Sequence, residues 1–261
     1  MDDAGYLYFR NLFGEYAADF RRDPLRKRVH DLFLELCLRL EPTIGLEIGA
    51  HEASFSQWLK AASPSTRCLA FEANPHVAEK YRDRVLATGV EYRHLAVGPT
   101  NGPAQLVIPT SVRHKERRLT NRMASLSLHT ESDSAETVEV ESVRLDDFLT
   151  LDADDRLVAW VDVEGATEVV LGSGPEVLRR TSLLYIEVER EAKWHDQWLD
   201  VDVARHLAGL GFTPIARDAQ RPHQYNVVFA APDLATDPEV ARLVADVYRV
   251  KRNAKRGTKG R

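Results

Sequence analysis

Hydrophobic positions along this chain recur at helical spacing in some segments and form short continuous runs in others. Between Tyr6 and Leu40 they return every three or four residues, which predicts two helices, the second with Asp23-Pro24 as N-cap and first helical position. Short apolar runs then alternate with helical segments. The predicted strands are Ile44–Ile48, Cys68–Glu72, Val90–Val97, Leu157–Val163 and Leu183–Val188. The predicted helices are Ser54–Ala62, Pro75–Ala87, a segment through Val169 and Val170, Pro175–Arg179 and Val201–Leu210. This alternation indicates βαβ units and a mostly parallel sheet.

The regular alternation is interrupted over residues 98–143. Turn residues at its start precede Ala104–Ile108, which we predict as a short strand. The basic segment Arg113–Arg122 is weakly patterned, and we predict a mobile loop near a site. Thr137–Val143 alternates like an edge strand, and Leu145–Leu149 suits a short helical turn.

The C-terminal part is predicted to close the sheet. Thr213–Ala216 and Tyr225–Ala230 suit an antiparallel pair of strands, and Pro238 to about Lys251 suits a final helix. The chain therefore divides into three expected parts. They are a helical segment at residues 1–43 that serves as a lid or an interface, an α/β domain at 44–235, and a helix with a basic tail at 236–261.

Length and composition narrow the class of protein. A chain of 261 residues can bury one sizeable core, and 44% hydrophobic with 29% charged residues is ordinary for a soluble globular protein. Cys37 and Cys68 lie in apolar segments and are interpreted as core residues, which favours a reducing, cytoplasmic compartment. No apolar run reaches membrane-spanning length. The net charge of −5 argues against extensive contact with nucleic acid.

The segment Ile44–Ser56 has the pattern of a strand, a glycine turn and the start of a helix. In open α/β sheets such turns lie at the carboxyl ends of strands, where ligands bind. Gly49 allows a tight turn and close approach of a ligand, and Glu47 offers a carboxylate. A dinucleotide fingerprint needs two further glycines that this loop lacks. The loop therefore suits a nucleoside without a pyrophosphate, such as S-adenosylmethionine.

Further carboxylates follow two other predicted strands. Glu72 ends the second strand, where an acid can accept both hydroxyls of a ribose in several cofactor classes. Asp162 and Glu164 end a buried strand in the sequence Asp-Val-Glu-Gly-Ala. Burying either acid without a partner costs free energy, so each is expected to contact a partner, a ligand or solvent.

These residues resemble the FkbM-type S-adenosylmethionine-dependent methyltransferases. Four segments in the family's order carry the resemblance, and they are Glu-Ile-Gly-Ala-His-Glu-Ala-Ser-Phe-Ser, Phe-Glu-Ala-Asn-Pro, Leu-Asp-Asp-Phe-Leu and Asp-Val-Glu-Gly-Ala, within Glu47 to Glu189. The resemblance implies a Rossmann-like class I methyltransferase fold with an antiparallel last strand, preceded here by extra N-terminal helices. It also implies methyl transfer to a hydroxyl of a sugar or of a glycosylated or polyketide-like metabolite.

The resemblance also assigns cofactor contacts by position. The loop residues Glu47, Gly49, Ala50 and His51 are expected to hold the methionine end. Contacts to the ribose and the adenine are expected from Glu72 with Ala73 and Asn74 beside it, and from Ala96 and Val97. Asp162 is expected beside the methyl group.

An alkyl hydroxyl has a very high pKa, so its methylation needs a base or a metal. Asp162 is our first candidate for the base, with Glu164, Glu189 and His195 in reserve. Asp162 and Glu164 could also cap the following helix and pair with an arginine. Alternatively, they could join Glu187 or Glu189 in a Mg²⁺ site, although no spacing demands it.

Candidate acceptor contacts lie beyond the strand that ends near Glu189. Trp194 and Trp198 could cover a sugar face and His195 could bind its hydroxyls, or both indoles could simply pack a loop onto the domain. Ser125 and Ser127, with His129, are expected to order the insertion over the site.

The expected partners are a small-molecule or carbohydrate acceptor and, in a homodimer, a second copy of the chain. Two other functions stay open. The tail from Lys251 carries six basic residues and no acid, and it would serve an RNA methyltransferase. A nucleotide-binding scaffold without turnover is the other alternative, because His51 and Trp160 are atypical for the family.

Overall fold

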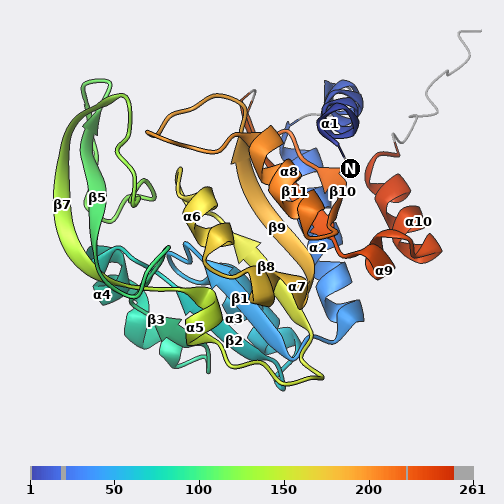
Figure 1. The fold of residues 1–261 in the computed structure, drawn as a ribbon, viewed down its shortest axis with the longest axis horizontal. Coiled ribbons are helices and arrows are strands. Elements are labelled where there is room, and N and C mark those ends of the chain that lie inside the picture. Colours follow the sequence, from blue (N-terminus) through green and yellow to red (C-terminus); the bar gives the residue numbers. More distant parts are fainter. Residues whose placement is uncertain (1, 19–21, 222, 250–261) are drawn as a thin grey trace, which may run out of the picture.

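The computed structural model describes residues 2–18, 22–221 and 223–249. A seven-stranded sheet with the strand order β10-β11-β9-β8-β1-β2-β3 forms its centre (Figure 1). The strands are β1 Ile44–Ile48, β2 Arg67–Phe71, β3 Glu91–Arg93, β8 Leu157–Val161, β9 Thr181–Glu189, β10 Thr213–Arg217 and β11 Gln224–Ala230. β11 is antiparallel to both of its neighbours, and the other pairs of this sheet are parallel. The predicted Rossmann-like α/β fold with an antiparallel last strand is confirmed.

Helices cover both faces of the sheet because alternate residues of a buried strand point to opposite sides. In β8, Leu157 and Val161 face one core, and Val158 and Trp160 face the other. The first core is covered by α1 Asp3–Ala18, α5 Leu145–Phe148, α6 Thr167–Gly172, α7 Pro175–Arg179 and α8 Asp200–Gly209. The second is covered by α2 Arg22–Leu40, α3 Ser54–Ala62, α4 Pro75–Leu86, α9 Pro232–Ala235 and α10 Pro238–Val247.

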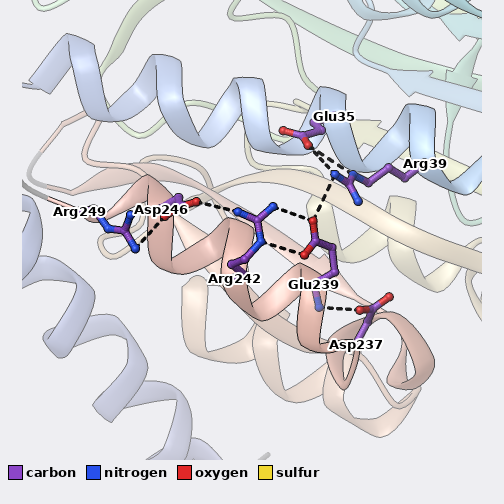
Figure 2. A network of polar contacts seen from close by, with 7 residues as sticks. All are labelled: Glu35, Arg39, Asp237, Glu239, Arg242, Asp246 and Arg249. Atoms are coloured by element: carbon purple, nitrogen blue, oxygen red, sulfur yellow. Dashed lines mark hydrogen bonds and ion pairs between the residues drawn. The ribbon is translucent and has the colours of Figure 1, made fainter.

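On the second face, α10 packs along α2. Figure 2 shows the polar contacts between them, in which Glu239 of α10 contacts Arg39 of α2 at 3.5 Å and Arg242 of its own helix at 2.6 Å. These exposed pairs contribute little free energy, so the apolar contacts beneath them hold the helices together.

Two predicted ends of helices differ from the structure. α2 begins at Arg22, so Asp23 lies inside the first turn and is not the residue that precedes the helix. α10 ends at Val247 instead of near Lys251. The basic tail from Lys251 lies outside the described residues.

A second, four-stranded sheet occupies most of the predicted irregular region. Its order is β4-β7-β5-β6, and its strands are β4 Ala96–Val97, β5 Gly102–Val112, β6 Lys115–Glu116 and β7 Ser132–Val143. Two predictions were therefore wrong. The run Val90–Val97 is split between the two sheets, and Thr137–Val143 is part of an interior strand. The basic segment Arg113–Arg122 is mostly irregular, as predicted, but it contains the short strand β6.

The predictions failed because much of this sheet is solvated. β7 alternates exposed and half-buried residues over most of its length, and its apolar core is the small cluster of Ala96, Leu106, Ile108 and Val140. A polar hairpin whose strands are held by main-chain hydrogen bonds leaves a weak hydrophobic pattern in the sequence.

The second sheet is tied to the main one through the loop after β9. The amide of Thr130 donates to the carbonyl oxygen of Lys193 at 2.8 Å, and the amide of His195 donates to that of Leu128 at 2.9 Å. In Figure 1 this orange loop extends from β9 toward the green strands.

Among the described residues, no helix has both the length and the hydropathy required to cross a membrane.

Candidate active site

Gly49 follows β1, and the end of β8 beside it leaves no room for a side chain at this position. Its φ is +78°, and a Cβ built on it would lie 2.8 Å from the carbonyl carbon of Asp162 and closer still to the oxygen. Its amide donates to the carbonyl oxygen of Phe71 at 3.0 Å. The glycine therefore brings the ends of β1, β2 and β8 together, in addition to forming the turn.

Glu47 lies within β1 and binds the first turn of α3. Its carboxylate accepts hydrogen bonds from the amides of Phe55 at 3.3 Å and Ser56 at 2.7 Å. The residue before α3, Ala53, has no side-chain oxygen to serve as a cap, so Glu47 supplies it from the sheet. Burial raises the pKa of Glu47 to about 7.

Glu72 follows β2 and is held by two backbone amides. Its carboxylate accepts from the amide of His51 at 2.6 Å and from that of Asn74 at 2.7 Å. Burial nevertheless raises its pKa to about 7. The side chain of Asn74 caps α4, accepting from the amide of His76 at 3.0 Å, and does not line the cavity beside Glu72.

Asp162 and Glu164 follow β8 and remain half-buried. The amide of Asp162 donates to the carbonyl oxygen of Ile48 at 3.0 Å, which fixes the loop beside β1. Burial raises the pKa of Asp162, although the positive charge of Arg122 opposes the shift. Burial and the neighbouring Asp162 raise the pKa of Glu164 to about 8.

These strand ends enclose the central cavity, with an empty volume of about 710 Å³ including its mouth. The main sheet and the segments that follow its strands contribute Ile48, Gly49, His51, Phe71, Glu72, Ala73, Leu95, Asp162, Val163, Glu164, Ala166 and Val170. The second sheet and its loop contribute Ala96, Val97, Leu106, Asn121, Arg122, Ala124, Ser125 and Leu126. The sequence indicated a basic loop near the site, but it did not single out Arg122.

The outer cavity adjoins the central one and shares Arg122, Asp162 and Glu164 with it. Its other lining residues are Val112, Arg113, Lys115, Arg117, Met123, His129, Glu131, Glu187, Lys193, Gln220, Arg221 and Gln224. Asp162 also lines two further hollows beside Trp160, one of which contains Glu47, Ala50 and His51. Asp162 thus lies where the hollows at the strand ends meet.

Three residues predicted to contact the acceptor lie away from these cavities. Trp194 is 1% exposed and packs against Gly165, where an added Cβ would lie 2.5 Å from its own Cβ. Trp198 packs on the first core, with its ring 5.1 Å from that of His206. His195 is exposed, and it lines neither the central cavity, nor the outer cavity, nor the two hollows beside Trp160. Both indoles pack onto the domain, which favours the alternative interpretation.

The remaining candidates are structural neighbours of the site. Ser125 lines the central cavity and donates from its hydroxyl to the carbonyl oxygen of Glu164, and it accepts from the amide of Ser127 at 3.1 Å. Glu189 is buried beside the outer cavity and accepts from Nε2 of Gln197 at 2.8 Å. Among the described residues, no group of three His, Cys, Asp or Glu side chains is arranged to hold a metal ion.

The central cavity suits a nucleoside that carries a positive charge. Glu72, Asp162 and Glu164 line it with pKa values raised by burial, and a cationic ligand would stabilise their ionised forms. Nδ1 of His51 is buried without a hydrogen-bond partner among the described residues, so it is available to a ligand. The apolar side chains on the cavity wall suit a nucleobase. The residues present therefore fit S-adenosylmethionine.

The strand order, the antiparallel β11 and acids at the ends of β2 and β8 define a Rossmann-like methyltransferase fold of class I. The profile of the methyltransferase FkbM domain matches residues 47–214. The chain belongs to this family of methyltransferases, as its motifs predicted.

Several known proteins are similar to this chain. The 2-O-methyltransferase NoeI of Sinorhizobium fredii (strain NBRC 101917 / NGR234) is 24% identical over 199 residues, which cover 70% of this chain and 78% of NoeI. Two solved structures are more distant. An S-adenosylmethionine-dependent methyltransferase from Clostridium acetobutylicum ATCC 824 has 7% identity and a TM-score of 0.40 over 87% of this chain and 98% of that one. Precorrin-6y C5,15-methyltransferase from Geobacter metallireducens GS-15 has 15% identity and a TM-score of 0.38 over 72% and 78%.

Proposed function

We propose that this methyltransferase uses S-adenosylmethionine to methylate a hydroxyl of a sugar, or of a glycosylated or polyketide-like metabolite. The observation that carries the proposal is the placement of Glu72 and Asp162 at the ends of two strands that face one cavity. The similarity to NoeI, a 2-O-methyltransferase, supports a hydroxyl acceptor.

The residues of the central cavity would hold the cofactor at both ends. Glu72 is oriented by two amides and can accept hydrogen bonds from the ribose hydroxyls. Ala96 and Val97 provide an apolar surface for the adenine, and His51 with the loop after β1 provides polar groups for the methionine end. When bound, the cofactor would supply a methyl group attached to a sulfonium. The sulfur is the leaving group and becomes a neutral thioether.

The chain must then orient a hydroxyl and remove its proton. Asp162 lines both the central and the outer cavity, so it is the acid that an acceptor in the outer cavity would meet beside the methyl group. As the hydroxyl oxygen bonds to the methyl carbon, its proton passes to the Asp162 carboxylate. Burial raises the pKa of Asp162, and a carboxylate with a raised pKa is a stronger base. A general base is most effective when its pKa lies near the pH of the reaction. Glu164 is the second candidate, because it lines the same two cavities.

The test is transfer of a labelled methyl group from S-adenosylmethionine to a panel of sugars and glycosides. Asp162→Asn should lower kcat by about 100- to 10,000-fold, the usual range for loss of a general base. Glu139→Gln, in an exposed position of β7, is the control and should leave kcat unchanged. Transfer to nitrogen, carbon or sulfur acceptors in place of hydroxyls would contradict the proposed acceptor class.

The structure favours neither alternative function. The RNA hypothesis depends on the basic tail, which lies outside the described residues. Neither atypical residue of the scaffold hypothesis closes the cavity. His51 lines it, and Trp160 stacks on Tyr185 with ring centroids 4.2 Å apart.

A further inference from the structure

The mouth of the outer cavity gathers positive charge from segments far apart in the sequence. Six cationic side chains line this cavity, from the β5–β6 hairpin, the loop after it, the loop after β9 and the loop between β10 and β11. They are Arg113, Lys115, Arg117, Arg122, Lys193 and Arg221. The whole chain carries a formal net charge of −5, so this concentration of cations is opposite in sign to the rest of the protein.

Several of these cations are free to bind a ligand. Arg113 is paired with Glu131 at 2.6 Å. In contrast, Lys115, Arg117 and Lys193 form no ion pair with any other residue that the structure describes. Lys115 and Arg117 are exposed, and Lys193 is half-buried at the edge of the cavity. Because no carboxylate among the described residues lies in direct ion-pair contact with these three side chains, they remain available for an anion from solution.

The inner end of the same cavity is acidic and rich in hydrogen-bonding groups. Asp162, Glu164 and Glu187 line it and are half-buried. The side-chain amides of Gln220 and Gln224 donate to the Glu187 carboxylate, the first at 2.9 Å. Carboxylates and carboxamides bind sugar hydroxyls well, because they offer both acceptors and donors in fixed positions. The cavity thus combines half-buried hydroxyl-binding groups around Glu187 with exposed cations, such as Lys115 and Arg117, on other parts of its wall.

We propose that the acceptor is a phosphorylated sugar, whose hydroxyl lies beside Asp162 while its phosphoryl group is bound by the cations at the mouth. This inference rests on the proposed function and names the substrate class of the same site. A doubly charged phosphoryl group matches several converging cations better than a single carboxylate does, and arginine binds phosphate with two parallel hydrogen bonds. A sugar phosphate and the diphosphate of a nucleotide-linked sugar share this chemistry.

The test is calorimetric titration of the full chain saturated with S-adenosylhomocysteine. The probes are glucose, glucose 1-phosphate, UDP-glucose and inorganic pyrophosphate. The two phosphorylated sugars should bind at least about 10-fold more tightly than glucose, with the advantage reduced by salt. The stronger of the two identifies the phosphoryl source. Arg117→Glu and Lys193→Glu should each weaken pyrophosphate binding by about 10-fold.

The control is Arg118→Glu, which makes the same charge change next to Arg117 at an exposed residue that does not line the outer cavity. It should leave pyrophosphate binding within about twofold, because its side chain does not reach the bound anion and its charge is screened by the solvent between them. All three variants should keep their affinity for S-adenosylhomocysteine, which shows that they are folded.

Equal affinity for glucose and its phosphates, or pyrophosphate binding that survives both charge reversals, would overturn the phosphorylated acceptor while leaving the cofactor site intact. Methyl transfer to a short RNA but to none of the sugar phosphates would overturn it as well. Failure of the wild type to bind S-adenosylhomocysteine would instead contradict the proposed function itself.

Discussion

The carboxylate of Glu72 accepts a hydrogen bond from the backbone amide of His51, with 2.6 Å between the nitrogen and Oε2. This bond joins the loop after β1 to the acid after β2, so the two halves of the proposed cofactor site are positioned by each other. His51 itself has a φ of 47°, in the left-handed region that residues other than glycine seldom adopt.

Gly49→Ala should destabilise the protein severely. The added Cβ would collide with the carbonyl group of Asp162, and the φ of +78° is unfavourable for alanine. We expect a loss of about 3 kcal/mol or more in the free energy of unfolding, measured by urea denaturation. Gly172→Ala, where an added Cβ meets nothing within 4 Å, is the matched control and should change stability by less than about 1 kcal/mol. Equal stability of the two variants would show that Gly49 is not constrained by β8.

Trp194→Ala should act on stability and not on acceptor recognition. The indole is 1% exposed and packs on Gly165 and the ring of His129, so its removal leaves a cavity that costs about 3–5 kcal/mol. Trp194→Phe keeps part of this packing, and its KM for the acceptor should match that of the wild type. A raised KM in the stable phenylalanine variant would instead place the indole in the acceptor site.

Glu164 should make the stability of the ligand-free protein depend on pH. Its pKa is raised to about 8, above the unfolded value near 4.5, so the folded state binds the proton more tightly. Its stabilising effect is complete below pH 4.5 and is lost as the pH rises through 8. Between pH 6 and 8 the wild type should lose about 1–2 kcal/mol more than Glu164→Gln.

Urea denaturation of both proteins across this pH range measures the difference. The subtraction cancels the opposite contribution of the buried histidines, such as His51, whose pKa is lowered by burial. Parallel pH profiles for the two proteins would mean that Glu164 titrates normally and is solvated.

The main sheet could be predicted from the sequence because its strands are buried. β1 is buried at all five residues and β8 at four of five, and such strands give continuous apolar runs. Acids that interrupt or end these runs were therefore visible as site candidates. Glu72 and Asp162 are both in the cavity that their positions indicated.

The rest of the site could not be predicted, because it depends on tertiary contacts. The second sheet supplies Leu106 and Arg122 to the cavity wall, but its hairpin is largely solvated and gives no clear pattern. Similarly, nothing local shows that Glu47 binds the first turn of α3, or that Trp194 is covered by the loop around it. An indole near a strand end looks the same in sequence whether it faces a ligand or the core.

The most direct test of the central claim is calorimetric titration with S-adenosylhomocysteine of the wild type, Glu72→Gln and the control Glu139→Gln. Replacing one carboxylate oxygen by an amide nitrogen removes an acceptor at the ribose position. We therefore expect micromolar binding to the wild type and the control, and binding at least about 10-fold weaker to Glu72→Gln. Equal binding to all three proteins would show that the ligand does not contact Glu72, and no binding to the folded wild type would contradict the cofactor site altogether.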